Sequence, residues 1–146
     1  MATVKEILNS KGNGIISVRP ETPISEVLKV LAEKKIGAVL VMKEGDLEGI
    51  FSERDFVRLT ALQGCNVNAP VGDVMTKRVY YMEPRETVER CMVQMSDKHI
   101  RHLPVVEDGK VLGVISIGDV VKSLISDYKD QIEGLENFIV GAEVQL

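Results

Sequence analysis

An internal repeat constrains the fold of this chain more than any other feature of its sequence. When the sequence is slid along itself by 64 positions, Pro20 falls on Pro84, and the two halves align without a gap as far as Leu59 and Ser123. Self-similarity of this kind indicates one structural unit present twice, with each copy covering apolar surface of the other. The identical pairs are Pro20/Pro84, Lys34/Lys98, Ile36/Ile100, Val41/Val105, Gly45/Gly109, Gly49/Gly113, Ser52/Ser116, Asp55/Asp119 and Val57/Val121.

The beginnings of the two repeats align at a different offset. Residues 4–8 resemble residues 71–75 at an offset of 67, so the first repeat carries three extra residues, which we place within 9–14. The chain is therefore expected to divide into four parts along the sequence. These are a first repeat at 4–63, a linker at 64–70, a second repeat at 71–125 and a helical tail at 126–146.

Hydrophobic spacing predicts the same succession of elements in each repeat. A short extended segment runs into a proline, and an amphipathic helix follows with apolar residues at i, i+3, i+4 and i+7. In the first repeat we expect Thr22 to cap this helix, Pro23 to take its first position and Gly37 to end it. The extended segments are 15–18 and 79–82.

Two strands and a second helix complete each unit. The run 38–42 is too short and too uniformly apolar for a surface helix, which indicates a buried strand. A turn with glycine follows, because glycine accepts the positive φ that tight hairpins need. The turns are 44–46 and 107–109, the strands after them are 47–51 and 111–115, and the last helices start near Ser52 and Ser116.

The predicted order of elements is thus β-α-β-β-α, twice. The helix between the first two strands favours a parallel crossover, and the tight turn favours an antiparallel pair. We therefore expect an α/β fold with small mixed sheets (α+β), in which two βαββα repeats pack with pseudo-two-fold symmetry.

Composition and charge exclude several functional classes. A net charge of −4 and a pI of about 5.3 argue against a nucleic-acid partner. No stretch approaches the roughly 20 apolar residues of a membrane span, and residues 1–6 have none of the features of a secretion signal. Cys65 and Cys91 form no C-x-x-C pattern, so we expect reduced thiols in a cytoplasmic protein and no zinc site.

A short motif recurs at the start of the last helix of each repeat. The motif is a glycine, two apolar residues and then Ser-x-x-Asp. Its serine and aspartate are Ser52 and Asp55 in the first copy and Ser116 and Asp119 in the second. Ser-x-x-Asp is a variant of the capping box. The N-terminus of a helix also attracts phosphate, and an aspartate can accept hydrogen bonds from ribose hydroxyls. Capping and binding are compatible, and recurrence at equivalent places favours a binding site.

A second candidate is the segment 101–104, Arg-His-Leu-Pro, which opens a strand where the first repeat has residues 37–40. Buried strand starts seldom carry Arg and His without a partner. Arginine offers a planar fork of donors that suits phosphate. In the alternative interpretation both side chains are solvated at the rim, or His102 bonds a backbone carbonyl.

The sequence carries no recognisable catalytic constellation. H-E-x-x-H, G-x-S-x-G and Walker A patterns are absent, and both histidines, His99 and His102, lie in one repeat. Cys91 falls on an apolar helix face, which leaves a Cys-His dyad without support. We expect no enzymatic activity and no catalytic cofactor.

These features resemble the cystathionine β-synthase (CBS) domain family in its stand-alone, tandem form, over residues 4–125. The resemblance is carried by the two Ser-x-x-Asp motifs, by Val-Met-Thr at 74–76 and by Arg-His-Leu-Pro-Val at 101–105. It implies a cleft in each repeat for an adenosyl ligand such as AMP, ADP, ATP, NAD or S-adenosylmethionine. AMP is the first expectation, and NAD or ATP are the alternatives. The resemblance also implies head-to-head homodimers.

The resemblance further implies a role for each matching residue. The aspartates of the two motifs would hold ribose hydroxyls, and the serines would contact phosphate. In the second site, residues 76–79 would line the adenine pocket, and Arg101 with His102 would face the phosphate. The candidate nucleotide-binding residues are Ser17, Val18, Gly37, Ala38, Ser52, Glu53, Arg54, Asp55, Thr76, Lys77, Val79, Arg101, His102, Leu103, Pro104, Ser116, Ile117, Gly118 and Asp119.

The first site departs from the second in three respects. It has the inserted loop 12–14, it lacks the Arg-His pair, and Arg54 stands where the second repeat has Gly118. We therefore expect the two sites to differ in affinity, with the second preferring AMP over adenosine more strongly.

The leading hypothesis is a nucleotide-sensing regulatory module, homodimeric, with an unknown regulated protein and with no nucleic-acid or membrane partner. The alternatives are a dimerisation scaffold with empty clefts and an enzyme such as a weak nucleotide hydrolase. Apolar residues after Leu124 predict a further helix, packed on its own chain or on a second chain. They are Tyr128, Ile132, Leu135 and Ile139.

Overall fold

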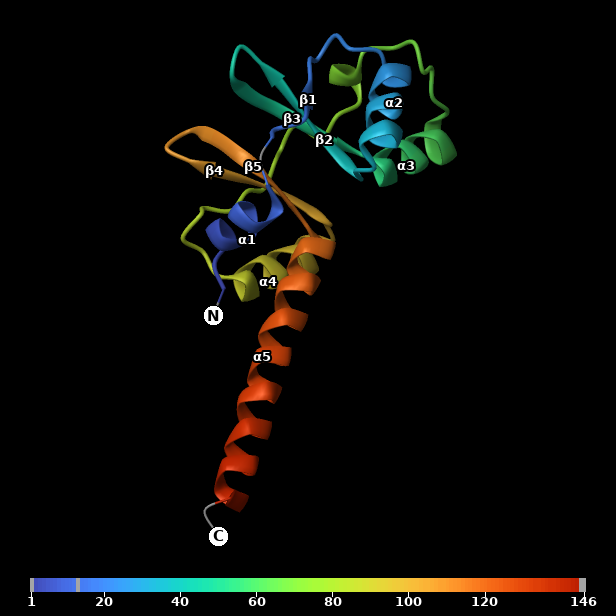
Figure 1. The fold of residues 1–146 in the computed structure, drawn as a ribbon. Coiled ribbons are helices and arrows are strands. Elements are labelled where there is room, and N and C mark those ends of the chain that lie inside the picture. Colours follow the sequence, from blue (N-terminus) through green and yellow to red (C-terminus); the bar gives the residue numbers. More distant parts are fainter. Residues whose placement is uncertain (1, 13, 145–146) are drawn as a thin grey trace.

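The computed structural model describes residues 2–12 and 14–144, so Asn13 of the predicted loop and the last two residues of the predicted tail lie outside the described part. The elements follow the predicted order apart from α1 and η1, which were not predicted, and the first strand of the second repeat (Figure 1). They are α1 (Val4–Lys11), β1 (Ser17–Val18), α2 (Ile24–Lys34), β2 (Ala38–Lys43), β3 (Asp46–Ser52), α3 (Glu53–Gln63), the 3₁₀ helix η1 (Val71–Asp73), α4 (Val88–Lys98), β4 (His102–Glu107), β5 (Lys110–Ser116) and α5 (Ile117–Val144).

The first repeat contains a three-stranded mixed sheet in the order β1-β2-β3. Strand β1 runs parallel to β2, and β2 pairs antiparallel with β3. The predicted crossover and hairpin are therefore confirmed. At the hairpin turn Glu44 and Gly45 have φ values of 51° and 85°, which is the left-handed backbone that this tight turn requires.

The second repeat keeps the hairpin of β4 and β5 but shortens the first strand. The predicted strand at 79–82 is reduced to one parallel bridge between Met82 and Val105. Only Met82 reaches the core there, whereas Tyr80 and Tyr81 are exposed. A single buried side chain gives the segment little apolar surface with which to hold a longer strand.

The predicted ends of the first helix are wrong. Helix α2 begins at Ile24, because Pro23 has an extended backbone (ψ 143°) and serves as N-cap, while the hydroxyl of Thr22 accepts from the amide of Arg19 at 3.1 Å. The helix ends at Lys34, and Lys35 takes the left-handed cap conformation that we expected near Gly37. In the second repeat Thr87 does cap α4, with its hydroxyl 3.3 Å from the amide of Arg90.

Each repeat lends its leading segment to the other repeat. The amides of Val4 and Lys5 donate to the carbonyls of Glu86 and Pro84, both at 2.9 Å, and Val4 lies in the core of the second repeat. Helix α1 accordingly packs against β5 and α5 (Figure 1). The packing units therefore differ from the repeats defined along the sequence.

The same exchange occurs in the opposite direction. The amides of Val71 and Gly72 donate to the carbonyls of Thr22 and Pro20, both at 2.8 Å, and Val71 lies in the core of the first repeat. The four residues are the counterparts of those in the first exchange, so the exchange relates the repeats by pseudo-two-fold symmetry.

Helix α5 is longer than predicted. The helix that starts after Ser116 and the predicted tail helix are one continuous element, which projects away from the body (Figure 1). Tyr128, Ile132, Leu135 and Ile139 are more than half exposed, so packing of the tail on its own chain is wrong. No helix in the described residues is both long and apolar enough to cross a membrane.

A close approach at Gly49 holds the two repeats together. The segment after η1 pairs with β3, because Ile50 and Thr76 exchange two backbone hydrogen bonds of 3.0 and 2.9 Å. A Cβ atom on Gly49 would lie 2.8 Å from the carbonyl oxygen of Thr76. At the equivalent Gly113 the nearest atom is the flexible Cδ2 of Leu8, at 2.9 Å.

We predict that Gly49→Ala lowers the free energy of unfolding by about 1–3 kcal/mol, since the added methyl group meets backbone that cannot move without breaking the bridge. Gly113→Ala should cost less, because the side chain of Leu8 can rotate. Urea unfolding of both variants and the wild type measures the difference. An equal loss in the two variants would contradict this account.

Candidate functional site

Two clefts lie between the repeats. Cleft A, with a volume of about 600 Å³, contains Ser116 and Asp119, whereas cleft B, with about 120 Å³, contains Ser52 and Asp55. In each cleft the Ser-x-x-Asp motif comes from one repeat, and the opposite wall comes from the start of the other repeat. Each cleft therefore exists only when both repeats are packed.

The opposite walls of the two clefts are built from equivalent positions. Each wall contains a basic residue upstream of the extended segment, the first residue of that segment and three residues at the start of the second strand. In cleft A they are Lys11, Ile15, Ile36, Gly37 and Ala38, and in cleft B they are Arg78, Val79, Ile100, Arg101 and His102.

The Ser-x-x-Asp motifs form capping boxes. At the start of α3 the Ser52 hydroxyl accepts from the amide of Asp55 at 3.2 Å, and Oδ2 of Asp55 accepts from the amide of Ser52 at 2.9 Å. Ser116 and Asp119 make the same two bonds at the same distances. The capping interpretation is thus confirmed. Each aspartate accepts its backbone hydrogen bond with Oδ2, so its other carboxylate oxygen, Oδ1, is left for a ligand.

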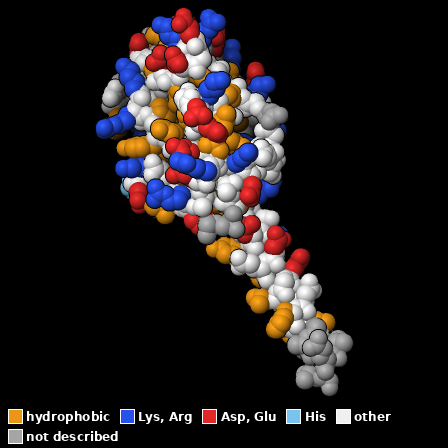
Figure 2. All heavy atoms as spheres, turned by 90° about the vertical axis from the view of Figure 1, so that its left-hand side faces the viewer, with side chains coloured by type: hydrophobic (Ala, Val, Ile, Leu, Met, Phe, Trp, Pro, Cys, Tyr) orange, Lys and Arg blue, Asp and Glu red, His pale blue; other side chains and the backbone are white. Residues whose placement is uncertain are grey.

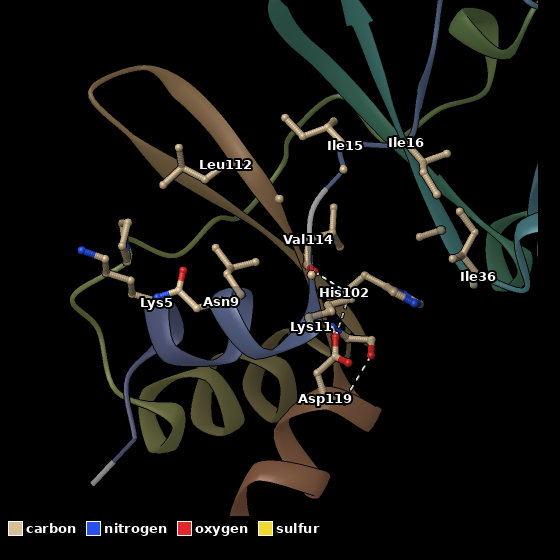
Figure 3. A pocket seen from close by; sticks show the side chains of 18 of the residues that line it. Lys5, Asn9, Lys11, Ile15, Ile16, Ile36, His102, Leu112, Val114 and Asp119 are labelled. Atoms are coloured by element: carbon tan, nitrogen blue, oxygen red, sulfur yellow. Dashed lines mark hydrogen bonds and ion pairs between the residues drawn. The ribbon is translucent and has the colours of Figure 1, made fainter.

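Lys11 reaches across cleft A to the motif of the second repeat. Its ammonium group lies 2.8 Å from Oδ2 of Asp119 and 2.8 Å from the carbonyl oxygen of Val114. In Figure 3 Lys11 and Asp119 point toward one another at one end of the cleft. Burial by itself would raise the pKa of Asp119, but hydrogen bonds from Lys11 and Ser116 and the charge of Lys11 hold that pKa below its usual value.

His102 forms part of both clefts. Its ring stands over Gly37, where a Cβ atom would lie 2.9 Å from Nε2, so glycine makes room for the imidazole. Burial lowers the pKa of His102, as does the positive charge of Lys11, against the opposing effect of Glu53 and Asp119. The ring is therefore neutral at pH 7, and it can offer one N–H donor rather than a cation.

The grouping of residues expected from the sequence is wrong for the second motif. Thr76, Val79 and Arg101 lie in cleft B with Ser52, not with Ser116 and Asp119. Because each repeat lends its leading segment to the other, the start of one repeat faces the motif of the other. A repeat in the sequence shows which positions are equivalent, but not which copy contributes to which cleft.

The structure brings together about half of the candidate residues. Gly37 and Ala38 join Ser116, Asp119 and His102 in cleft A, while Arg54 joins cleft B. The other candidates are not among the residues that line the two clefts. They are Ser17, Val18, Glu53, Lys77, Leu103, Pro104, Ile117 and Gly118.

Several cleft residues were not identified from the sequence. Lys11 and Arg78 could have been identified from the sequence. The offset of 67 that aligns residues 4–8 with 71–75 also aligns Lys11 with Arg78. Extending that alignment would have shown one basic residue before each extended segment. The remaining cleft residues are ordinary apolar or charged residues without a distinguishing pattern. They include Leu8, Ile16, Lys35 and Leu112 in cleft A and Arg58, Tyr80 and His99 in cleft B.

The two clefts differ because equivalent positions carry side chains of different size. Gly37 in cleft A corresponds to Arg101 in cleft B, and Gly118 in the second motif corresponds to Arg54 in the first. Arg58 and Arg78 add to the positive charge of cleft B. Cleft A is consequently larger and walled by aliphatic side chains such as Ile15 and Leu112 (Figure 3), and cleft B is smaller and rich in arginine.

Comparison with known proteins agrees with this architecture. A protein with CBS domains from Burkholderia ambifaria MC40-6 is 41% identical, with a TM-score of 0.82 over 86% of this chain and 96% of that chain. CBSX3, a mitochondrial CBS domain-containing protein of Arabidopsis thaliana, is 31% identical over 95% of this chain and 72% of its own length. The CBS domain pair of protein MJ0100, solved in complex with 5-methylthioadenosine and S-adenosyl-L-methionine, is 25% identical, with a TM-score of 0.77 over 87% of this chain and 98% of that chain.

The family model for the CBS domain matches this chain twice, at residues 4–61 and 71–126. These two matches contain both Ser-x-x-Asp motifs and nearly all of the residues that line the two clefts. The chain belongs to the CBS domain family, as a tandem pair of CBS repeats.

Proposed function

We propose that this chain is a regulatory module without catalytic activity, which binds an adenine nucleotide in cleft A and acts as a homodimer on a regulated protein. AMP is the proposed ligand, and NAD and ATP are the alternatives. The observation that carries the proposal is the composition of cleft A, which combines an aliphatic wall with Ser116, Asp119 and Lys11 at one end. The cytoplasmic location expected from the sequence stays a prediction.

The size and polarity of cleft A suit a nucleoside phosphate. Its volume of about 600 Å³ lies within the range of about 300–1,000 Å³ that is usual for small-molecule sites. A flat adenine base fits between Ile15 and Ile36, with the ribose directed to Asp119. The phosphate then lies at the N-terminus of α5, where the helix dipole favours an anion. The structure of MJ0100 with adenosine-derived ligands supports the same ligand class.

A second candidate function is a dimerisation scaffold whose clefts stay empty. The ion pair between Lys11 and Asp119 favours it, because Oδ2 of Asp119 is already bonded to Lys11 and to the amide of Ser116, which leaves one carboxylate oxygen for ribose. Thermal denaturation with AMP, ATP, NAD and S-adenosylmethionine separates the two functions. A ligand at a hundred times its Kd adds about 2.7 kcal/mol of stability. A scaffold would show no shift with any of them, and turnover of ATP or NAD would contradict both functions.

The proposed ribose contact of Asp119 gives a sharper test. Hydrogen bonds to a charged acceptor contribute about 1.5–3 kcal/mol each, so Asp119→Ala should weaken AMP binding by about ten- to a hundredfold. Asp119→Asn keeps an acceptor oxygen and should lose less. Calorimetric titration with AMP and 2′-deoxy-AMP is the measurement, and the wild type should prefer AMP while Asp119→Ala loses that preference.

Asp55→Ala is the matched control, because it removes an identical capping box from cleft B. Each alanine variant should lose about 0.5–2 kcal/mol of stability from the cap. If both variants lose stability equally and both still bind AMP as tightly as the wild type, Asp119 acts only as a helix cap.

The arginine cluster of cleft B predicts a second, phosphate-dependent binding event. Arg101→Ala should weaken AMP at cleft B by about tenfold or more, as expected for the loss of a charge-assisted hydrogen bond. Adenosine, which lacks the phosphate, should lose much less. Lys77→Ala is the control, since it removes the same charge from a neighbouring residue that lines neither cleft. Equal losses for AMP and adenosine would make Arg101 a structural residue.

A further inference from the structure

Helix α5 uses only its first turns to pack on the body. Val120 is fully buried, and Leu124 packs against the core of the second repeat. Between Leu124 and Val140, no side chain of α5 is buried. Gly134 lies in this part with open space around it. Most helical stability in proteins comes from packing of an apolar face, and the projecting part of α5 has no such packing among the described side chains.

An apolar row runs along the exposed face of α5. It starts beside the body and continues to the end of the described side chains, and Figure 2 shows hydrophobic side chains along one edge of the projecting helix. We call this set the α5 row. Its exposed fractions lie between 46% and 63%. Its members are Val121, Ile125, Tyr128, Ile132, Leu135 and Ile139.

The spacing of the α5 row alternates between four and three residues and averages 3.6 residues from Val121 to Ile139, so the row lies on one face of the helix. The alternation also fits the a and d positions of a heptad repeat. Ile125, Ile132 and Ile139 occupy the a positions, and Val121, Tyr128 and Leu135 occupy the d positions. Isoleucine at a favours two parallel strands when the d positions carry leucine, and Leu135 supplies one such position. No charged residue occurs in the row.

We propose that the α5 row forms a parallel, in-register, two-stranded coiled coil with the α5 row of a second copy of this chain. The proposal rests on the homodimer that is part of the proposed function, and it specifies the surface and the relative orientation of the two chains. A heptad row is complementary to a helix with the same period, and a second copy supplies that helix without any other component.

The distribution of acidic residues along α5 supports a second copy of this chain as the partner of the α5 row. Asp127, Asp130 and Glu133 lie outside the a and d positions, so the acidic residues of the tail face solvent in the dimer. In a parallel pair each g position lies beside the following e position of the other helix. Here Gln131 lies beside Glu136, so no two like charges meet at that contact.

Area supports the parallel arrangement. From Val121 to Ile139 the row is about 27 Å long at about 1.5 Å per residue, which is short for an interface that must supply about 800 Å² per partner. A parallel coil places the two bodies at the same end, where they add to the interface. Helix α4, which packs against α5, exposes Met92 and Val93 for such a contact. An antiparallel coil would hold the bodies apart.

The first experiment places a charge within the row. Ile132→Lys should raise the dimer dissociation constant at least about tenfold, because two ammonium groups would meet in the seam. Asn137→Lys is the matched control, with the same new residue on the outer face of the same helix. Sedimentation equilibrium over a concentration series measures the constants. AMP titration of Ile132→Lys tests nucleotide binding separately, so failure of the coil is distinguishable from failure of the proposed function.

The second experiment tests orientation. In a parallel, in-register coil Leu135 faces Leu135 of the second copy, so Leu135→Cys should form a disulfide between chains under mild oxidation. The background carries Cys65→Ser, and Cys91 stays inert because burial raises the pKa of its thiol to about 11. Asn137→Cys is the control on the outer face.

Selective loss of the dimer in Ile132→Lys together with cross-linking of Leu135→Cys supports the proposal. A monomeric wild type overturns it, as does a dimer that Ile132→Lys and Asn137→Lys affect equally, since the bodies alone would then form that dimer. Cross-linking no faster for Leu135→Cys than for Asn137→Cys overturns the parallel arrangement.

Discussion

The exchange of leading segments between the two repeats is the interaction on which the rest of the structure depends. Val4 inserts into the second core and Val71 into the first, each fixed by backbone hydrogen bonds to the other repeat. A repeat without its partner would lose a fully buried valine and leave backbone amides unpaired, and units of about 60 residues have little stability to spare. The same exchange brings the start of one repeat opposite the Ser-x-x-Asp motif of the other, so folding and cleft formation are one event.

Substitutions at equivalent positions of the two repeats make cleft A and cleft B different in size and charge. Gly37 admits the ring of His102 and leaves cleft A open, whereas Arg101 at the equivalent position fills cleft B with charge. His102 is the common wall of both clefts and is neutral at pH 7, because burial lowers its pKa. The two clefts therefore share one side chain, and a neutral imidazole carries one N–H donor, which it can direct to only one of them.

The repeat made most of the fold predictable, and its limits follow from what a repeat can show. Hydrophobic spacing gave the order of elements, and Ser52 and Ser116 gave the helix starts, because both are local properties of the chain. The cap at Thr22 failed because Pro23 pairs with Pro70 across the linker in a β-bridge and so keeps an extended backbone. Which repeat completes which cleft depended on long-range packing, and no local pattern encodes it. The projection of α5 away from the body was not predicted for a related reason. Helical spacing identifies the apolar face of a helix but not the surface that covers it.

Helix α5 connects the ligand site to the proposed dimer. Asp119 lies in its first turn, where Lys11 bonds it across cleft A, and Val121 begins the exposed row less than one turn later. In the proposed binding mode the ribose meets Oδ1 of Asp119, beside the Oδ2 that Lys11 bonds, so a ligand there can change the contact between α5 and α1. Such a change reaches a regulated protein only if the ligand binds one arrangement of α5 more tightly than another, because a ligand with equal affinity for both shifts no equilibrium. Because Asp119 and the α5 row lie on one continuous helix, a shift of its first turn would move the start of the row with it.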